Sequence, residues 1–281
     1  MSATVVLATC KPLPNYDPEH APIIEALGRR GVSCEAVAWD ARVSWTGAEV
    51  VVLRSTWDYH LRREEFLSWV ERTALLTSVW NPAKVVRWNS HKGYLRELSE
   101  RGVPTVPTEW VPKGKTPSLS ELLTRRGWTD AVAKPAISAG GFETVRVRHT
   151  ADAQAAFERI AAHSEVMVQP YLRSVEGHGE RSLVYIGGEF SHAVRKPPLL
   201  KAVERPSDDV VPAIAEADEL ELAKRVLAAV ESELLYARVD LARDESGRPM
   251  LMELEVIEPS LFLRHAKGAA DRLAEAIIQK F

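Results

Sequence analysis

The chain has 281 residues, enough for two or three structural units around a sizeable core. Its 36 Lys and Arg residues against 39 Asp and Glu residues leave a formal charge of −3, which argues against a strongly basic nucleic-acid binder. Apolar residues make up 46% and charged residues 27%, as in ordinary globular proteins, and 2 cysteines are too few for a disulfide scaffold.

The N-terminal part of the chain predicts a small open α/β sheet. Short apolar, β-branched runs predict strands at 4–9, 33–39 and 49–53, and amphipathic stretches predict helices at 19–30 and 61–73. Ligands of such sheets bind at the carboxyl ends of the strands. The polar segment 54–59 follows the third strand directly, so we expect it to face a ligand.

The rest of the chain alternates strands and helices and predicts two hairpins. A capping box at Ser118 and Glu121 starts a helix that ends near Gly127. The further helices are predicted at 91–101, 151–162, 214–230 and 269–280, and the further strands at 131–134, 143–148, 165–169, 235–242 and 250–257, with hairpin turns at 187–188 and 244–247.

The sequence shows no pattern typical of a membrane-spanning helix or an export signal. The longest apolar runs are only a few residues, and the first residues lack a basic region followed by a small-residue cleavage site. We therefore expect a cytoplasmic α/β (α+β) protein with no membrane partner.

Three carboxylates converge in the predicted C-terminal hairpin. Glu253 and Glu255 lie two residues apart on one strand and therefore share a face. A symmetric hairpin places Asp240 opposite Leu251, one pair from Glu253, with Arg238 beside them. Oxygen ligands without His or Cys favour Mg²⁺. The alternative is a solvated acidic face paired with Arg238.

Two lysines are candidate phosphate ligands. Lys134 ends a strand, and the small residues Ser138, Gly140 and Gly141 follow in a loop that can bring backbone N–H groups against phosphate oxygens. Lys92 lies early in its predicted helix, where the positive end of the helix favours anions. The alternatives are solvated surface lysines and an ordinary turn.

The segment 166–172 is a candidate adenine site. An apolar strand runs there into the extended residues Gln169, Tyr171 and Leu172, whose backbone offers donors and acceptors, and Glu180 is placed to accept from ribose hydroxyls. Arg195 and Lys196 add cations that can meet a transferring phosphoryl group. The alternatives are a strand with its exit loop and an exposed basic pair.

Taken together, Lys92, Lys134 with its loop, the segment 169–172, and Asp240 with Glu253 and Glu255 resemble the ATP-grasp family in order and spacing. The resemblance implies three units, namely an N-terminal substrate domain (1–88), a central lid (89–166) and a C-terminal domain with the metal site (167–281). It implies ATP between the last two units, with Mg²⁺ or Mn²⁺ as the metal. Lys92 and Lys134 would hold α- and β-phosphates, residues 169–172 adenine, Glu180 ribose (with Glu176 as a weaker candidate), and the three carboxylates the metal.

More specific strings resemble the small bacterial members typified by the O-ureido-serine cyclo-ligase of cycloserine biosynthesis, an antibiotic pathway. They are the segments 54–59, 81–82, 87–89, 236–241, 252–255 and 258–262. This resemblance implies an amino-acid-like substrate received by Arg54, Ser55, Thr56, Asp58, Glu258 and Ser260, with Asp58 or Glu258 facing an ammonium group.

The implied reaction is ATP-dependent ligation of a carboxylate to a nitrogen nucleophile. The carboxylate attacks the γ-phosphoryl group, Arg195 and Arg238 neutralise the developing charge, and the nitrogen then displaces phosphate from the acyl carbon. The nucleophile belongs either to a second molecule or to the same one. The rival interpretations are an ATP-binding protein without turnover and a small-molecule kinase, and a homodimer is a further expectation.

Overall fold

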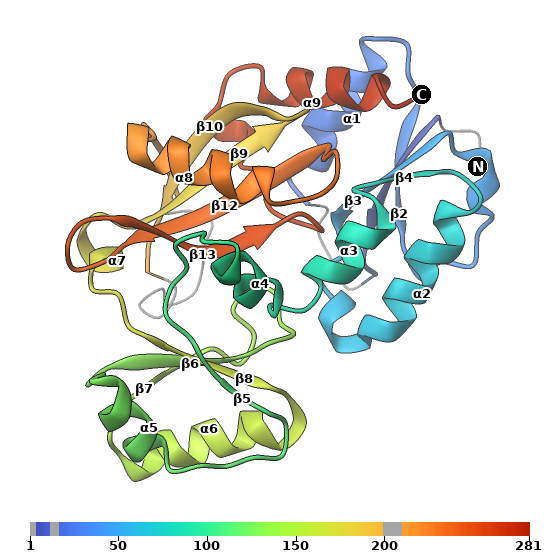
Figure 1. Cartoon of the computed structure of the whole chain (residues 1–281). Coiled ribbons are helices and arrows are strands. Elements are labelled where there is room, and N and C mark those ends of the chain that lie inside the picture. Colours follow the sequence, from blue (N-terminus) through green and yellow to red (C-terminus); the bar gives the residue numbers. More distant parts are fainter. Residues whose placement is uncertain (1–3, 12–16, 199–209) are drawn as a thin grey trace.

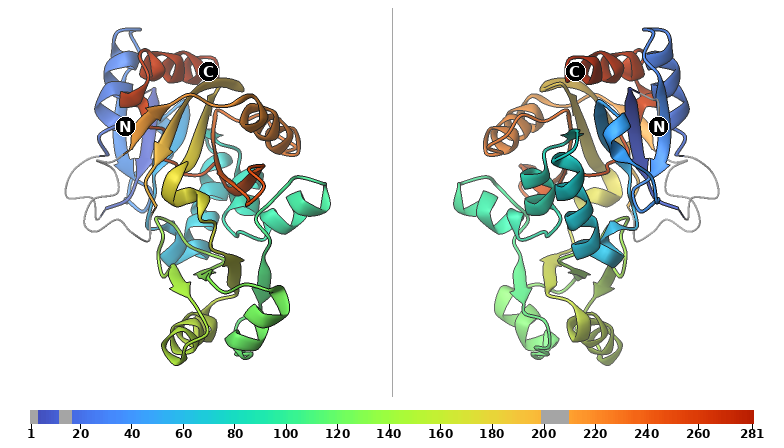
Figure 2. Two further views of the ribbon diagram at one scale, coloured as in Figure 1. Left: turned by 90° about the vertical axis from the view of Figure 1, so that its left-hand side faces the viewer. Right: turned by 90° about the vertical axis from the view of Figure 1, so that its right-hand side faces the viewer.

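The computed structural model describes residues 4–11, 17–198 and 210–281, and the strands in these ranges form three sheets. Figure 1 shows two of the sheets in an upper body and the third in a lower lobe. Both side views in Figure 2 show the same separation. The predicted mixed α/β class is confirmed.

The first sheet is parallel and comes from the N-terminal part of the chain. Its strands lie in the order β2 (Cys34–Ala38), β1 (Val5–Thr9), β3 (Val50–Ser55) and β4 (Ser78–Trp80), accompanied by α1 (His20–Gly28), α2 (Arg63–Ala74), α3 (Ala83–Asn89) and 3₁₀ turns at Trp45–Gly47 and Tyr59–Arg62.

The second sheet is antiparallel and forms the lower lobe. Its strands lie in the order β5 (Glu109–Val111), β8 (Val166–Pro170), β6 (Ala131–Pro135) and β7 (Val145–Val147), with helices α5 (Leu119–Arg126) and α6 (Ala151–His163). The predicted start of α5 is confirmed, because the Ser118 hydroxyl accepts a hydrogen bond from the Glu121 amide at 3.2 Å. The division of the chain after residue 166 stays a prediction, and β8 runs across that point.

The third sheet is antiparallel and carries most of the charged candidates. Its strands lie in the order β11 (Val211–Ala213), β10 (Glu189–Lys196), β9 (Glu180–Ile186), β12 (Tyr236–Arg243) and β13 (Pro249–Glu255), with helices α4 (Tyr94–Glu100), α7 (Ser174–Gly177), α8 (Ala217–Ala228) and α9 (Ala269–Ile278) and a 3₁₀ turn at Leu263–His265.

The first and third sheets share a hydrophobic core, whereas the lower lobe has its own. Val5 and Val52 of the first sheet belong to the same buried cluster as Val184 and Tyr236 of the third, together with residues of α1 and α9. The lower lobe is instead packed around Phe157 and its neighbours from α5, α6 and the second sheet. The first and third sheets are therefore packed together, and the lobe also contacts this body directly, because Ala136 and Met167 belong to a buried cluster of the third sheet.

Several local predictions differ from the structure, and β5, α7 and β11 were not predicted at all. β4 and α3 were not predicted, since β4 has only three residues and α3 begins immediately after Pro82, in an Asn-Pro pair that reads as a break. The helix predicted at 91–101 begins at Tyr94, so Lys92 lies in the turn before α4 and not in the helix. The helix predicted at 61–73 is preceded by a 3₁₀ turn and extends to Ala74.

The outer edge of β13 is bonded by side chains and a loop instead of another strand. The Asn89 amide donates to the Leu254 carbonyl at 2.8 Å and accepts from the Val256 amide at 3.3 Å. Asn81 donates to the Val256 carbonyl at 2.7 Å, and the Tyr94 hydroxyl accepts from the Leu254 amide at 3.0 Å. These contacts fix the strand that carries Glu253 and Glu255.

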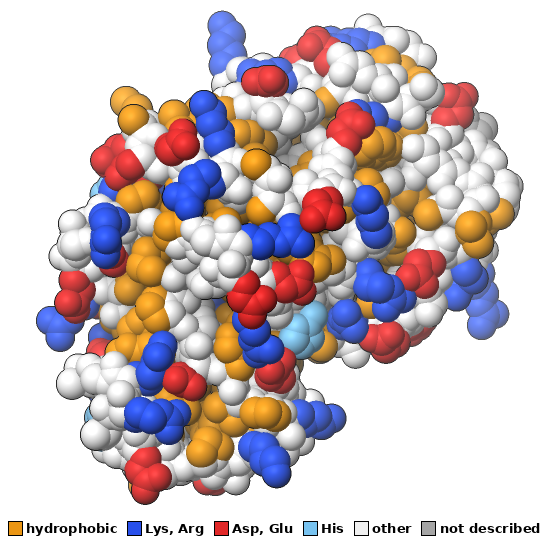
Figure 3. All heavy atoms as spheres, in the orientation of Figure 1, with side chains coloured by type: hydrophobic (Ala, Val, Ile, Leu, Met, Phe, Trp, Pro, Cys, Tyr) orange, Lys and Arg blue, Asp and Glu red, His pale blue; other side chains and the backbone are white. Residues whose placement is uncertain are grey.

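The surface agrees with the near-neutral composition. In the face shown in Figure 3, Lys and Arg side chains are interspersed with Asp and Glu side chains. Among the described helices, none is long and apolar enough to cross a membrane.

Candidate active site

A cavity of about 520 Å³ lies where the second and third sheets meet, and most of the predicted site residues line it. The second sheet contributes Lys134 and Gln169, and the third contributes Glu180, Asp240 and Glu253. The other predicted residues in the lining are Lys92, Ser138, Gly140, Gly141, Tyr171, Leu172, Arg238, Glu255, Glu258 and Ser260. Positions up to 168 residues apart in sequence are thus brought to one place.

The three carboxylates of the hairpin converge more closely than a symmetric register implies. A β-bulge lies between Asp240 and Leu241, so that Leu241 pairs with Leu251 but Asp240 pairs directly with Glu253. The predicted pairing of Asp240 with Leu251 is therefore wrong by two residues, of which one arises at the turn, since Leu241 pairs with Leu251, and one at the bulge. Arg238 pairs with Glu255 in the same register, and cross-strand partners share a face.

Cations hold these carboxylates together. The Arg238 guanidinium donates to Asp240 at 2.9 Å through both Nε and Nη2 and also to Glu255. The Lys196 ammonium contacts Asp240 at 2.8 Å and forms an ion pair with Glu180. The Lys92 ammonium pairs with Glu253. The like charges are therefore partly neutralised by the chain itself.

The balance still leaves room for a metal cation. The described lining contains four cationic side chains (Lys92, Lys134, Lys196 and Arg238) against five carboxylates (Glu180, Asp240, Glu253, Glu255 and Glu258). Burial raises the pKa of Glu255 to about 7 despite Arg238 beside it. At Asp240 burial also opposes ionisation, but Arg238 and Lys196 outweigh it and hold the pKa well below its usual range. An oxygen-only set with uncompensated negative charge fits Mg²⁺.

Lys134 fits an anionic ligand. Its side chain is half-buried in the cavity wall and takes no part in any hydrogen bond or ion pair found within residues 4–11, 17–198 and 210–281. Burial is the largest influence on the pKa of its ammonium group and lowers that pKa. A phosphate group beside Lys134 would supply the missing negative charge.

The loop after Lys134 has the backbone freedom that close approach to phosphate requires. Gly140 and Gly141 adopt φ values of 57° and 76°, in the left-handed region that favours glycine. Ser138 is buried and donates to the Pro135 carbonyl at 3.3 Å. Beyond the glycines, Phe142 lies 5.0 Å from the His60 ring, so the loop reaches the N-terminal part of the chain.

The predicted adenine segment is anchored at both ends. The Gln169 amide donates to the Thr108 hydroxyl at 2.9 Å, and the Tyr171 hydroxyl donates to Glu176 at 3.0 Å. The Arg146 guanidinium stacks on the Tyr171 ring at 3.6 Å from its centroid. Tyr171 is therefore held in place in the cavity lining.

Arg195 lies outside the cavity lining, and Lys196 lies in it. A bulge between Phe190 and His192 shifts the β9–β10 register, so that Lys196 pairs with Glu180 while Arg195 pairs with Arg181 on the opposite face. There Arg195 donates to the carbonyls of His178 and Gly177 at 3.0 and 2.8 Å. Both cations were predicted to meet a phosphoryl group, and of the two the register of β10 places only Lys196 in the cavity lining.

The segment 54–59 also has some residues in the cavity lining and others outside it. Trp57 and Tyr59 line the cavity, whereas Arg54, Ser55, Thr56 and Asp58 do not. The fully buried Arg54 donates to Glu19 at 2.8 Å, and Ser55 donates to Asp17 at 2.6 Å. These side chains lie behind the cavity wall, where Glu19 also accepts from the Leu261 and Leu263 amides, both at 2.8 Å.

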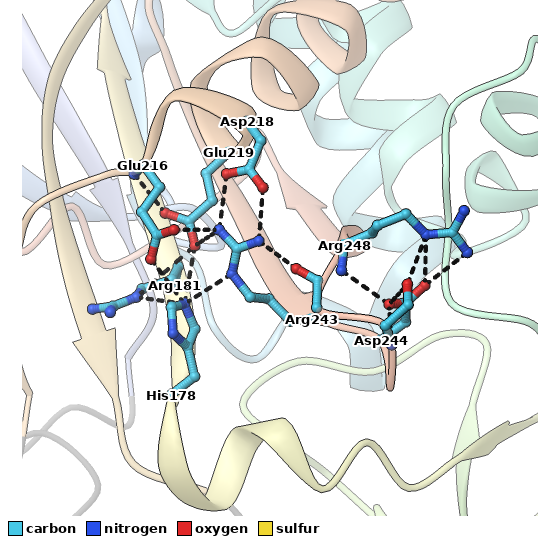
Figure 4. Close-up of polar contacts among 10 residues, drawn as sticks. His178, Arg181, Glu216, Asp218, Glu219, Arg243, Asp244 and Arg248 are labelled. Carbon is cyan, nitrogen blue, oxygen red and sulfur yellow. Dashed lines mark hydrogen bonds and ion pairs between the residues drawn. The ribbon is translucent and has the colours of Figure 1, made fainter.

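A second charged cluster, outside the cavity, is an ion-pair network. His178, Glu216 and Glu219 bring ligand atoms within 4.8 Å of one another. Figure 4 shows Arg243 between these carboxylates and Asp218, which it contacts at 2.7 Å, and Arg181 against His178 at 3.1 Å. The arginines already neutralise the carboxylates, so the cluster ties β12 to the start of α8.

Comparison with known proteins gives the same family over nearly the whole chain. A family profile described as "D-cycloserine synthetase DcsG, N-terminal domain" matches residues 5–81. The chain is 34% identical to the cycloserine biosynthesis protein DcsG of Streptomyces lavendulae, over 94% of each chain. The crystal structure of D-cycloserine synthetase DcsG is similar with a TM-score of 0.91 and 32% identity, covering 98% of this chain and 99% of that one.

More distant structures share the fold. The RimK domain protein ATP-grasp from Sphaerobacter thermophilus DSM 20745 has a TM-score of 0.71 and 18% identity, covering 98% of this chain and 100% of that one. The predicted resemblance is therefore confirmed. The chain belongs to the family of the D-cycloserine synthetase DcsG, and its fold is that of the ATP-grasp ligases.

Proposed function

We propose that the chain activates the carboxylate of a small amino-acid-like substrate with ATP and closes a ring through a nitrogen of the same molecule. The observation that carries this is the convergence of Lys92, Lys134 and the three hairpin carboxylates on one cavity. Ring closure, as opposed to joining two molecules, is supported by full-length similarity to a protein named as D-cycloserine synthetase. An O-ureido-serine is accordingly the first substrate to test.

The nucleotide is held between the second and third sheets in this proposal. Lys92 and Lys134 bind α- and β-phosphates, with backbone N–H groups of the loop 138–141 beside them. Gln169, Tyr171 and Leu172 border the adenine, and Glu180 accepts from the ribose. Lys134 is the strongest of these assignments, because its ammonium has no partner of its own among the described residues.

Asp240, Glu253 and Glu255 would hold Mg²⁺, or Mn²⁺ in its place. When bound, the metal neutralises negative charge on the phosphates during phosphoryl transfer. Arg238 and Lys196 hold the carboxylates in position, since both cations contact Asp240 and the guanidinium reaches Glu255.

The reaction has two balanced steps. A carboxylate oxygen of the substrate forms a bond to the γ-phosphorus while the bond to ADP breaks. The nitrogen nucleophile then attacks the activated carbonyl carbon and loses its proton, and inorganic phosphate leaves with the former carboxylate oxygen. Arg238 and Lys196 face the cavity and neutralise charge on the phosphoryl oxygens, the part predicted for Arg195 together with Arg238.

Water must be kept from the activated acyl group. The loop 138–141 covers one side of the cavity, and Ala139 packs against the hydrophobic cluster of the first sheet that includes Trp57. The contact of Phe142 with His60 extends this cover. A closed loop therefore excludes solvent from the reacting carbon.

The test supplies ATP, Mg²⁺ and each enantiomer of O-ureido-serine, and measures ADP together with product mass. The proposal predicts ADP and a cyclised product that retains no phosphate. Serine with added amines tests joining of two molecules. ADP formation with a phosphorylated product would favour a kinase, and ATP binding without ADP formation from any carboxylate would contradict the proposal.

A further inference from the structure

Glu258 is a buried carboxylate in the cavity wall that the nucleotide and metal assignments leave unused. It follows β13, is 9% exposed, and lines the cavity. Its backbone carbonyl accepts a hydrogen bond from the Trp57 indole at 3.0 Å, which fixes the position of the residue. Its carboxylate takes part in no hydrogen bond or ion pair with the residues that the structure describes.

The neighbouring charges do not compensate this carboxylate. Lys92 is paired with Glu253, and Arg238 with Asp240 and Glu255. Burial, reinforced by the nearby Glu255, raises the pKa of Glu258 well above its usual range. An unpaired buried carboxylate is costly, so a cation from a ligand would stabilise its charged form.

The surroundings of Glu258 suit an organic ammonium group better than a second metal ion. Trp57, Tyr59 and Phe262 line the same cavity with aromatic rings, which suit the apolar part of a small organic cation. Mg²⁺ prefers several oxygen ligands and retained waters, as the hairpin carboxylates offer. One carboxylate beside aromatic rings instead matches a single ammonium on a short carbon chain.

The other carboxylate that the sequence allowed for this role is already engaged. Asp58 accepts from the Trp39 indole and from Arg62, both at 2.8 Å, and lies outside the cavity lining. Of the two candidates, Glu258 alone faces the cavity and lacks a partner among the described residues.

We propose that Glu258 binds the α-ammonium group of the substrate and selects α-amino acids over carboxylic acids that lack the amine. This assignment rests on the proposed function, since it specifies the substrate of the same cavity. Glu258 is then a specificity determinant that contacts the group next to the reacting carboxylate.

The experiment compares wild type with Glu258→Gln on two compounds, O-ureido-serine and its deamino analogue 3-(ureidooxy)propanoate, which keeps both reacting groups. Loss of one charge-assisted hydrogen bond predicts a KM for the amino acid raised roughly 10- to 100-fold in the variant, with kcat changed much less. In wild type, the KM for the deamino analogue should likewise exceed the KM for the amino acid by roughly 10- to 100-fold. The variant should show no further loss on the analogue.

Binding measurements keep the test separate from turnover. Calorimetry with enzyme saturated in ADP and Mg²⁺ measures the affinity of both compounds even if no turnover occurs. Absence of ADP formation by wild type would then reject the proposed function, whereas equal affinity of wild type and Glu258→Gln for the amino acid would reject the role of Glu258.

Two further results would overturn the assignment. One is an equal loss with both compounds, and the other is a shifted Mg²⁺ requirement, which would make Glu258 a metal ligand. Asp58→Asn is the matched variant and should leave the ratio of the two KM values unchanged. The thermal midpoint of Glu258→Gln should stay level or rise, because the amide replaces a buried carboxyl group that has no partner among the described residues. A fall of several degrees would indicate a structural role.

Discussion

Lys134 is a residue of this cavity whose charge suits ligand binding and adds little to the stability of the fold. Most charged side chains of the lining are tied to one another, such as Lys92 to Glu253 and Lys196 to Asp240. Lys134 has no such partner in the described part of the chain, and burial lowers the pKa of its ammonium. The positive charge of Lys134 therefore contributes little to folding stability, but it would stabilise a bound anionic ligand.

Replacement of Lys134 by Met should weaken nucleotide binding without destabilising the fold. We expect ADP affinity to fall roughly 10- to 100-fold in the presence of Mg²⁺, the effect of one charge-assisted hydrogen bond, with an unchanged or higher thermal midpoint. Calorimetry and thermal unfolding measure the two quantities. Lys115→Met, at an exposed lysine, is the control and should alter neither. Unchanged ADP affinity in Lys134→Met would refute the phosphate assignment.

The residue types of the site could be predicted, but not the register that orients them. The alternation of Glu253 and Glu255 and the position of Lys134 at a strand end follow from the order of residues along the chain. Two β-bulges do not, because a bulge inserts one unpaired residue without a distinctive residue type. The bulge in β10 brings Lys196 to the cavity in place of Arg195.

At the scale of elements, the edge of β13 depends on Asn89 and Asn81, which lie 165 and 175 residues before the carbonyls to which they donate. An edge strand presents unpaired N–H and C=O groups, and at β13 Asn89 and Asn81 bond several of them. The strings 81–82 and 87–89 were noted as part of the family resemblance. Their contact with β13 could not be predicted, because it depends on tertiary packing.

Replacement of Asn89 by Ala should cost the protein about 2 to 4 kcal/mol of unfolding free energy. The change leaves two buried backbone groups, the Leu254 carbonyl and the Val256 amide, without the Asn89 hydrogen bonds. Denaturant unfolding measures this value. Gln279→Ala removes an exposed amide and serves as the control. A change below about 0.5 kcal/mol for Asn89→Ala would show that water replaces these bonds.

The lower lobe contains a pH-dependent ion pair between Asp130 and Arg146. The guanidinium donates to Asp130 at 2.8 Å and holds the pKa of that carboxyl at about 2, below its ordinary value of 3.8. A carboxyl with a lowered folded pKa stabilises the fold above its unfolded pKa, and this contribution is lost as pH falls from about 4 towards 2. Arg146 also stacks on Tyr171, so the pair supports the cavity mouth.

The variant Asp130→Asn should therefore have a lower thermal midpoint than wild type at pH 6, and the difference should shrink at pH 3. Thermal unfolding at the two pH values measures this. Glu25→Gln, at an exposed carboxylate of α1, controls for the general loss of one negative charge. A difference that stays constant or grows on acidification would contradict the ion pair.

At the scale of the whole molecule, the hydrophobic clusters divide the chain into a body and a lobe around the cavity. The first and third sheets share one cluster and the lobe has one of its own, while Met167 and Ala136 link the lobe to a cluster of the third sheet. The mixed α/β class could be predicted from periodicity, whereas the division into three units came from the family resemblance. The shared core could not be predicted, because strands of equal apolarity fit either partner sheet.

Nucleotide binding should couple the lobe to the body. With ADP and Mg²⁺ we expect slower amide hydrogen exchange in the loop 138–144 and in residues 169–172, and unchanged exchange in β1 and β3, which are already buried. Exchange measured by mass spectrometry with and without ligand tests this. Equal protection across all segments, or none in the loop, would contradict a nucleotide between the two sheets.

The central claim is that the substrate carboxylate is activated by transfer of a phosphoryl group to its own oxygen. The direct measurement uses O-ureido-serine labelled with ¹⁸O in the carboxylate and follows the label into inorganic phosphate by mass spectrometry. The account predicts one ¹⁸O atom in each phosphate released with cyclised product. Phosphate without the label would show that water attacks ATP, and would contradict carboxylate activation in this cavity.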